Sequence, residues 1–153
     1  MRTTSAVVAV VAATGMLATG VVPASAAKPS GTIQCTVYLT EQPGGTELKG
    51  VDKGPLACGQ FGAGAQRDTF AMVFNAAKTG GTGLVKFTDT YKTGTVSGTW
   101  KLTFKVSGMA VALRYAVKYT GGTGAYKGIQ GSGSGQGNLT SMTTGTFTYK
   151  VTV

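Results

Sequence analysis

The stretch Tyr119-Thr120-Gly121-Gly122-Thr123-Gly124-Ala125-Tyr126-Lys127-Gly128-Ile129-Gln130-Gly131-Ser132-Gly133 decides the fold class of this chain. It follows an alternating strand pattern and leads into a Gly/Ser segment that again alternates like a strand. Glycine adopts positive φ freely, so the four residues Gly121, Gly122, Thr123 and Gly124 predict a tight reversal. A phosphate-binding loop would need a following helix or a GxxxxGK[ST] pattern, and the sequence has neither. We therefore expect a structural loop that also includes Gly128 and in which Tyr126 closes over an apolar end.

Period-two alternation of apolar and polar residues continues on both sides of this loop, which is typical of half-buried strands. The segments with a strand pattern are 33–39, 69–76, 84–91, 100–106, 111–119, 131–137 and 146–153. Segment 69–76 is apolar on both faces and is expected to be buried on both. Short strands separated by glycine turns predict a sandwich or a barrel. Because the last strand would invite aggregation as an open edge, we expect it to pair with the first and to close an antiparallel barrel of about eight strands.

Two features of the connections leave alternatives open. The segment 41–64 is rich in Gly and Pro and is predicted to be one long connection. The string TGGTG occurs at 79–83 and again at 120–124, which indicates either a hairpin used twice or a chance repeat in a Gly/Thr-rich chain.

The first 26 residues have the three parts of a secretory signal peptide: a positive start, an apolar run and a small-residue cleavage site. We expect a secreted protein without a membrane span, a flexible N-terminus at 27–31 and one β-barrel domain at 32–153. Cys35 and Cys58 are the two cysteines of the chain, and export predicts a disulfide between them.

The composition excludes several classes of function. With no histidine and two cysteines, the chain lacks the ligands of a typical zinc site and the base of a hydrolytic triad, so we expect no metal, no cofactor and no hydrolase. Without Arg2, 13 basic residues stand against 5 acidic ones. The basic side chains alternate with the apolar ones, which predicts a basic outer face. An anionic cell-wall polymer is one partner for that face. Nucleic acid is not expected because stacking aromatics are missing beside the charges, and homo-oligomerisation is left open.

The 121–131 segment resembles the GGTG-x-aromatic-x-x-x-x-G hairpin of the allene oxide cyclase-like and dirigent-like β-barrel proteins, and the similarity is strongest from Ala112 to Gly137. The resemblance implies an eight-stranded antiparallel barrel with an apolar pocket at one mouth. It also implies a barrel that steers cyclisation or radical coupling, an isomerase-like activity without a cofactor. The catalytic residues of those plant families have no matching positions in this chain, so catalysis is not carried over.

The candidate site residues follow from the strand faces. Aromatic residues on the apolar faces are candidates either for core packing or for a ligand pocket; those proposed for the pocket are Phe87, Trp100, Phe104, Tyr115, Tyr119 and Tyr149. Asp89 shares a face with apolar neighbours and is a weak catalytic candidate if that face points inward. The alternative is that the strand ends near Thr88 and leaves Asp89 in a solvated turn. The other four acids, Glu41, Glu47, Asp52 and Asp68, are expected on the surface.

The sequence thus predicts a secreted β-barrel that binds a small apolar molecule. The alternative is a non-enzymatic, basic, envelope-associated binding protein whose barrel core is filled.

Overall fold

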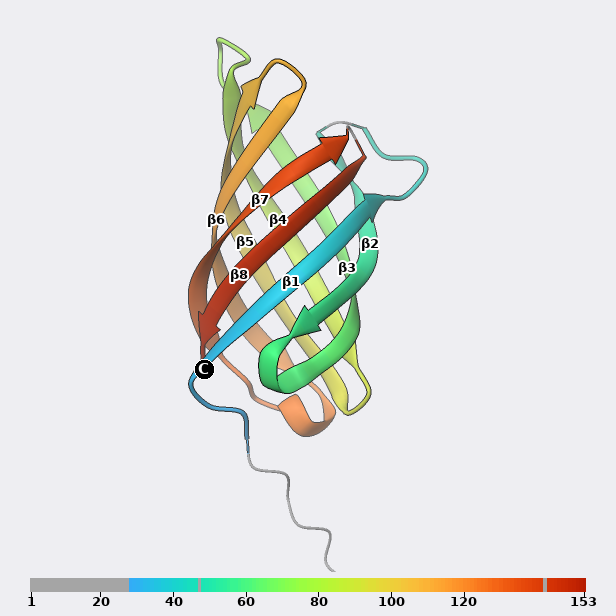
Figure 1. Ribbon diagram of the computed structural model, residues 1–153, viewed down its shortest axis with the longest axis vertical. Helices are drawn as coiled ribbons and strands as arrows, with labels where there is room; N and C mark the ends of the chain where they lie inside the picture. The colour runs from blue at the N-terminus through green and yellow to red at the C-terminus, as the bar shows by residue number, and fades with distance from the viewer. Residues whose placement is uncertain (1–27, 47, 142) are drawn as a thin grey trace, which may run out of the picture.

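The computed structural model describes residues 28–46, 48–141 and 143–153, and this part of the chain forms eight antiparallel strands closed into a barrel (Figure 1). The strands are β1 (Thr32–Glu41), β2 (Lys49–Cys58), β3 (Gly62–Phe74), β4 (Gly80–Tyr91), β5 (Gly94–Ser107), β6 (Ala110–Gly122), β7 (Gly131–Ser141) and β8 (Thr144–Thr152). Each strand pairs with the next one in the chain, and β8 pairs with β1 along their full length. The predicted all-β barrel and its closure by the last strand are confirmed.

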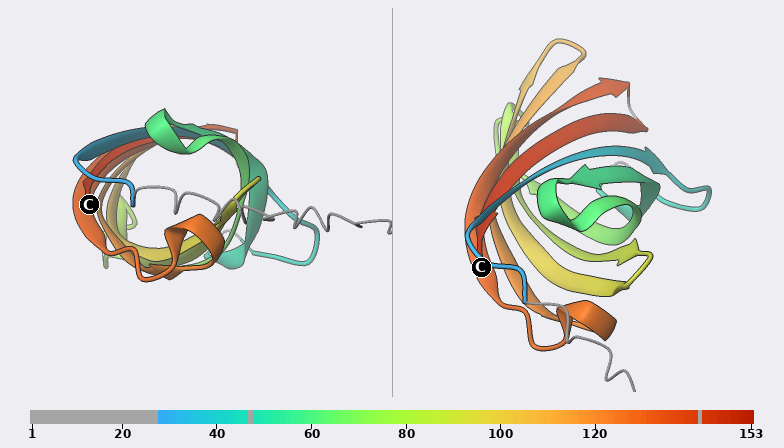
Figure 2. Two further views of the ribbon diagram at one scale, coloured as in Figure 1. Left: turned by 90° about the horizontal axis from the view of Figure 1, so that it is seen from below. Right: turned by 60° about the horizontal axis from the view of Figure 1, so that its bottom comes forward.

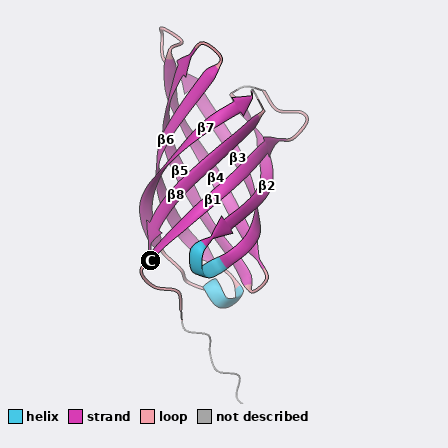
Figure 3. Cartoon of the chain, viewed as in Figure 1, coloured by secondary structure: helices cyan, strands magenta, loops and turns pink. Residues whose placement is uncertain are grey.

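Two short 3-10 helices, η1 (Gly59–Phe61) and η2 (Gly124–Tyr126), are the only helices among the described residues (Figure 3). Both lie at the same end of the barrel as the two chain ends of the described region. The predicted signal peptide falls within residues 1–27, which lie outside the described residues.

The alternating pattern places one face of every strand inside the barrel. In β1, for example, Ile33, Cys35, Val37 and Leu39 are buried and the residues between them are mainly exposed. Large aromatic side chains fill most of the interior. Trp100 stacks on Tyr115 with ring centroids 4.8 Å apart and contacts the rings of Phe147 and Tyr149. The middle of the barrel is therefore a packed core.

Cys35 and Cys58 are directly opposite each other on β1 and β2 and form the predicted disulfide. Both residues are buried on the inner side of the barrel wall. The bond joins residues 23 positions apart and ties β2 to the first strand.

The prediction of one long connection at 41–64 is wrong, because β2 occupies its second half. Gly50, Gly54 and Pro55 disguise this strand, since glycine and proline are rare in strand interiors. The β1–β2 pairing is interrupted at that place: Val37 pairs with Leu56, and pairing resumes between Thr40 and Lys53. Proline has no amide hydrogen to donate, and the gap in the β1–β2 ladder contains Pro55.

One further expectation needs correction, and one alternative left open by the sequence is decided. Segment 69–76 is not buried on both faces: it belongs to β3, and Val73 on its outer side is 68% exposed. The two TGGTG strings are not equivalent turns either. At the first, β4 begins with Gly80, after a turn around Asn75; at the second, β6 ends at Gly122.

The two ends of the barrel differ, as the views in Figure 2 show. At one end, η1 and η2 fold over the rim. Their buried aromatic side chains, Phe61 and Tyr126, meet with ring centroids 4.8 Å apart, and Tyr91 contacts both rings. Gly124 and Gly128 adopt positive φ in the loop around η2, in agreement with the predicted role of the glycine tract. This end is closed by side chains, and the other end carries hairpin turns.

Candidate functional site

An apolar cavity of about 100 Å³ opens at the end of the barrel that η1 and η2 do not cover. We call it the mouth cavity. Its lining residues come from the inner faces of β1 through β8 and from two connecting loops. They are Leu39, Glu41, Leu48, Asp52, Asp68, Phe70, Met72, Phe74, Val85, Trp100, Leu102, Phe104, Val106, Val111, Leu113, Tyr115, Leu139, Thr143, Thr144, Gly145 and Phe147.

Glycines make room for the side chains that form the wall of this cavity. Gly145 belongs to the lining, and on its inner side the ring of Phe147 lies where a Cβ would be. On β4, the ring of Phe104 lies over Gly81, and Phe74 packs edge-on against Phe104 with ring centroids 5.3 Å apart. The side chains of Met72 and Leu102 lie next to Gly83. The cavity wall is thus built of aromatic and aliphatic side chains, with Trp100 and Tyr115 at the level of the packed core.

Three acidic residues interrupt this apolar lining, and they are direct neighbours across three strands. Glu41 of β1 is paired with Asp52 of β2, and Asp52 is paired with Asp68 of β3. Residues opposite each other in an antiparallel pair have their Cβ atoms about 5 Å apart, so like charges there repel. We call these three residues the carboxyl row. All of them line the mouth cavity, and the lining contains no lysine or arginine among the described residues.

The pKa values of Asp68 and Asp52 reflect their burial first and this crowding second. Burial, together with the negative charge of Asp52, raises the pKa of Asp68 to about 8, while a hydrogen bond from Gln66 opposes the shift. Burial also raises the pKa of Asp52 to about 6, with a contribution from Glu41. Near neutral pH, Asp68 and Asp52 therefore bind more protons than separate carboxyl groups in water would.

Asp68 is the innermost member of the row and is 2% exposed. The side-chain amide of Gln66 donates a hydrogen bond to its Oδ2 at 2.8 Å. Its Oδ1 has no hydrogen-bond partner among the described residues. A buried carboxyl oxygen without a partner is costly, and a hydrogen-bond donor in the adjoining cavity would relieve this cost.

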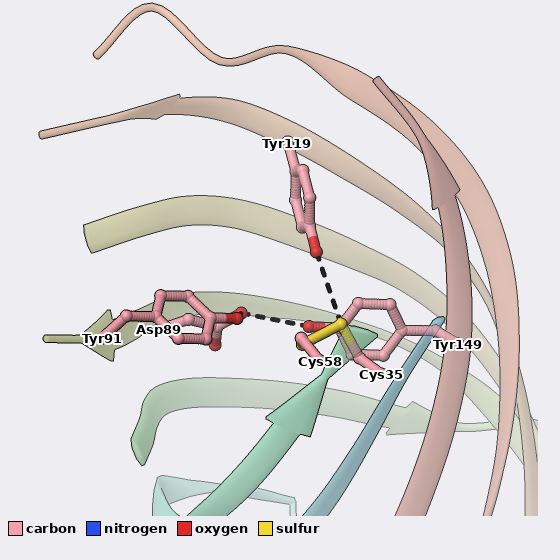
Figure 4. The surroundings of a disulfide bond; sticks show 6 residues. All are labelled: Cys35, Cys58, Asp89, Tyr91, Tyr119 and Tyr149. Atoms are coloured by element: carbon pink, nitrogen blue, oxygen red, sulfur yellow. Dashed lines mark hydrogen bonds between the residues drawn. A yellow bond between two sulfur atoms is a disulfide. The ribbon is translucent and has the colours of Figure 1, made fainter. Parts of the chain in front are cut away.

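A second polar cluster lies deeper in the barrel, around Asp89 (Figure 4). Tyr149 donates a hydrogen bond to Asp89 Oδ2 at 3.0 Å, and Tyr91 donates to the same oxygen at 3.4 Å. Tyr119 contacts this region from β6 and donates to the disulfide sulfur of Cys35 at 3.7 Å. The four side chains come from β4, β6 and β8 and converge on the inner face of the disulfide.

Burial raises the pKa of Asp89 to about 7, against the two tyrosine hydrogen bonds, which lower it. Burial also raises the pKa of Tyr91, Tyr119 and Tyr149, and the charge of Asp89 adds to each shift. The tyrosine hydroxyls therefore keep their protons and act as donors. The expectation that Asp89 belongs to a solvated turn is wrong, because β4 continues to Tyr91 and its alternation keeps Asp89 inside.

The structure separates the predicted pocket residues into two groups. Trp100, Phe104 and Tyr115 line the mouth cavity. Phe87, Tyr119 and Tyr149 belong to the packed core beneath it and are not part of its lining, and neither is Asp89. A molecule in the mouth cavity would thus meet Asp68 and not Asp89.

Sequence reasoning missed the carboxyl row. The expectation that these three acids lie on the surface is wrong for Asp68, which is buried, whereas Glu41 and Asp52 are half-buried in the lining of the cavity. Glu47 lies outside the described residues. The signal was present in β2: Asp52, Gly54, Leu56 and Cys58 share a parity, which places Asp52 on the inner face once this segment is recognised as a strand.

The outer face of the barrel is basic, as predicted. Every lysine and arginine among the described residues is exposed. A shallow outer groove of about 700 Å³ crosses β5 through β8 above the small residues of β7, and it is lined by Lys101, Arg114 and Lys150 together with hydroxyl and amide side chains. A second hollow of about 490 Å³, which shares Arg114, continues toward Lys105.

Comparison with known proteins gives no match: no protein-family model, no curated protein and no solved structure corresponds to this chain. The resemblance to allene oxide cyclase-like and dirigent-like proteins stays a prediction. Within the described ranges, no helix is long and apolar enough to cross a membrane. Nor do the described residues contain a group of three or more His, Cys, Asp and Glu side chains that could hold a metal ion.

Proposed function

We propose that this protein binds a small apolar molecule, or the apolar part of a larger one, in the mouth cavity. The observation that carries the proposal is the contrast between the two ends of the barrel. Phe61, Tyr91 and Tyr126 close one end, whereas the other end opens into a hollow lined by Phe70, Leu102 and other apolar side chains. Filling such a hollow removes apolar surface from water, which favours binding by about 25 cal/mol per Å².

The dimensions limit what can bind. The aromatic core fills the middle of the barrel, so the ligand occupies the mouth and does not pass through the molecule. A dry cavity of roughly 150 Å³ holds a benzene ring, and the mouth cavity of about 100 Å³ suits a slim alkyl chain or a small ring that projects partly into solvent.

The proposal also includes an extracellular location and the steering of a reaction in the cavity. The disulfide and the predicted signal peptide support an extracellular protein. The steering of a cyclisation or coupling, which the resemblance implies, would use the cavity as a mould. The carboxyl groups in reach of the ligand would then be those of Glu41, Asp52 and Asp68, since Asp89 is not in the lining.

The test is a titration with 1-hexanol, a neutral probe, followed by methyl NMR. We expect saturable shifts for the methyl groups of Leu102 and Leu113, which line the cavity, and none for Ile129 at the closed end. Replacing Val111 with Phe fills the cavity and should abolish the shifts. The matched control is Ala112→Phe, because Ala112 is the exposed neighbour on β6. Equal shifts at both ends, or binding that Val111→Phe leaves intact, would contradict the proposal.

A second candidate function rests on the outer groove, where Lys101, Arg114 and Lys150 flank a surface of small polar residues. Such a groove fits an anionic polymer such as a wall polyphosphate, because clustered positive charges attract polyanions. Changing these three residues to Gln should weaken binding of a polyphosphate chain at least tenfold and reduce its salt dependence. The control changes Lys49, Lys53 and Lys78 to Gln, which removes the same charge outside the groove. If both triple variants lose equal affinity, binding follows net charge and the groove has no special role.

A further inference from the structure

We infer that the mouth cavity is selective for ligands with a protonated amine, whose ammonium group contacts the carboxyl row while the apolar part fills the hollow. This inference rests on the proposed function and specifies the class of ligand. Its first support is the register, which aligns Glu41, Asp52 and Asp68 on adjacent strands and points all three into the cavity.

The second support is the unpartnered oxygen of Asp68. This residue is 2% exposed, and Gln66 satisfies one carboxyl oxygen while the other has no partner among the described residues. An ammonium group donates up to three hydrogen bonds, and a charge-assisted bond to a carboxylate is stronger than a neutral one. A ligand amine at Asp68 would satisfy this oxygen and would also approach the carboxyl group of Asp52.

The third support is the distribution of charge over the barrel. All described lysines and arginines are exposed, whereas the four described acids are the cavity residues Glu41, Asp52 and Asp68 and the buried Asp89. Repulsion among neighbouring carboxylates is relieved when a cation arrives, so a cationic ligand gains an interaction that a neutral one does not. An anionic ligand would meet the row without any basic residue in the described lining.

The shape of the row also indicates an organic cation. Three carboxyl groups in a line across strands do not surround a point, and no metal-binding cluster is found among the described residues. An ammonium group on an apolar chain can be bound by carboxyl oxygens that lie on one side of it, without being surrounded.

The experiment compares 1-hexylamine, 1-hexanol and hexanoate, which share one apolar chain and differ in the head group. Binding is followed by the methyl shifts and by the fluorescence of Trp100, the single tryptophan of the chain, which lines the cavity. At pH 8 we expect hexylammonium to bind at least tenfold more tightly than hexanol, and hexanoate to bind most weakly. Asp68→Asn should remove most of the preference for hexylammonium and leave the affinity for hexanol within twofold.

The matched control is Asp89→Asn, which removes a buried carboxyl group that does not line the cavity and should keep the preference. A second measurement on the unmodified protein covers the case in which Asp68→Asn fails to fold. The ratio of hexylammonium to hexanol affinity should rise from pH 5 to pH 8.5, as Asp52 and Asp68 lose their protons. The charge of Asp89 on β4 also raises the pKa of Asp68, and the charge of Arg67 on the outer side of β3 lowers it.

The outcomes separate the two proposals. Equal affinities for hexanol and hexylammonium in the unmodified protein would overturn the inference and leave the apolar site in place. Preference for the amine that persists in Asp68→Asn, or that does not change with pH, would also overturn it. If none of the three probes produces saturable shifts, the proposed function and the inference fail together.

Discussion

At the scale of single residues, the unusual feature is that two aspartates, Asp68 and Asp89, are buried inside the barrel. Asp89 is fully buried among tyrosines and keeps its proton to about pH 7 because burial penalises the carboxylate. An aspartate in the unfolded chain releases its proton near pH 3.8. Between these two values the folded protein holds a proton that the unfolded chain has lost, so stability falls as the pH rises through this window and levels off above it.

We therefore predict that Asp89→Asn reduces the pH dependence of stability, because asparagine does not titrate. From pH 4.5 to pH 8, the unmodified protein should lose about 3 kcal/mol more of its unfolding free energy than the variant, at about 1.4 kcal/mol per unit of pKa shift. Urea unfolding at several pH values measures this difference. Lys101→Gln, a change of charge on the outer face, should leave the slope as it is. A slope that is the same in Asp89→Asn would mean that other groups carry the dependence.

At the scale of elements, β7 is unusual because glycines take the inward positions of the strand. A Cβ at Gly135 would collide with the ring of Tyr115, and with the backbone oxygen of Thr148 on β8. At Gly137 it would collide with the ring of Phe147. The missing side chains on β7 thus provide the space for the aromatic residues of β6 and β8. The hydroxyl of Tyr115 then donates to the backbone oxygens of Gln136 and Thr148 at 3.0 and 3.1 Å.

We predict that Gly135→Ala destabilises the protein by about 1–3 kcal/mol, the usual cost of overpacking a core. Ser134→Ala, one position away on the exposed face, should change stability by no more than about 0.5 kcal/mol. Thermal or urea unfolding of both variants checks the difference. Equal stabilities would show that the ring of Tyr115 can move aside without loss.

The contrast between β7 and β2 shows what the sequence could and could not predict about elements. The Gly/Ser segment of β7 kept its period-two pattern, so the strand was predictable. In β2, Gly54 and Pro55 broke the pattern and the strand was missed. The carboxyl row was missed for the same reason, since three acids become neighbours only through the pairing of Asp52 with Glu41 and Asp68. Alternation places a residue on a face, but register between strands decides which residues meet.

At the scale of the whole molecule, two links hold the first strand in the closed barrel. The last strand pairs with the first from Thr32–Thr152 to Thr40–Thr144, and the disulfide adds a covalent link between β1 and β2. The sequence predicted both, because an even pair of cysteines and a long apolar tail strand each require a partner. It left open whether the barrel was filled, since side-chain packing across the interior depends on all strands at once: the middle is filled and the mouth is not.

We predict that replacing Cys35 and Cys58 with alanine lowers the unfolding free energy by about 3 kcal/mol, from the loss of a cross-link that closes a loop of 23 residues in the unfolded chain. Urea unfolding of the variant and of the unmodified protein under non-reducing conditions measures the loss. The barrel should still form, because strand pairing on both sides of β2 remains. A variant that is as stable as the original would show that the strand ladder alone holds β1 and β2 together.

Because β8 pairs with β1, the same barrel can form from a chain in which the strands start at a different point of the circle. The amide of Gly31 donates to the carbonyl of Val153 at 3.1 Å, and the reverse bond is 3.0 Å, so these two residues are already neighbours. Because every strand forms its ladder of backbone hydrogen bonds only with the strands before and after it, the eight strands follow one another in a circle that has no required starting point. A short linker between Val153 and Gly31 and a cut at the exposed tip near Met109 would give a circularly permuted chain with the same barrel. In that chain the hairpin between β8 and β1 would be local and the one between β5 and β6 would be open.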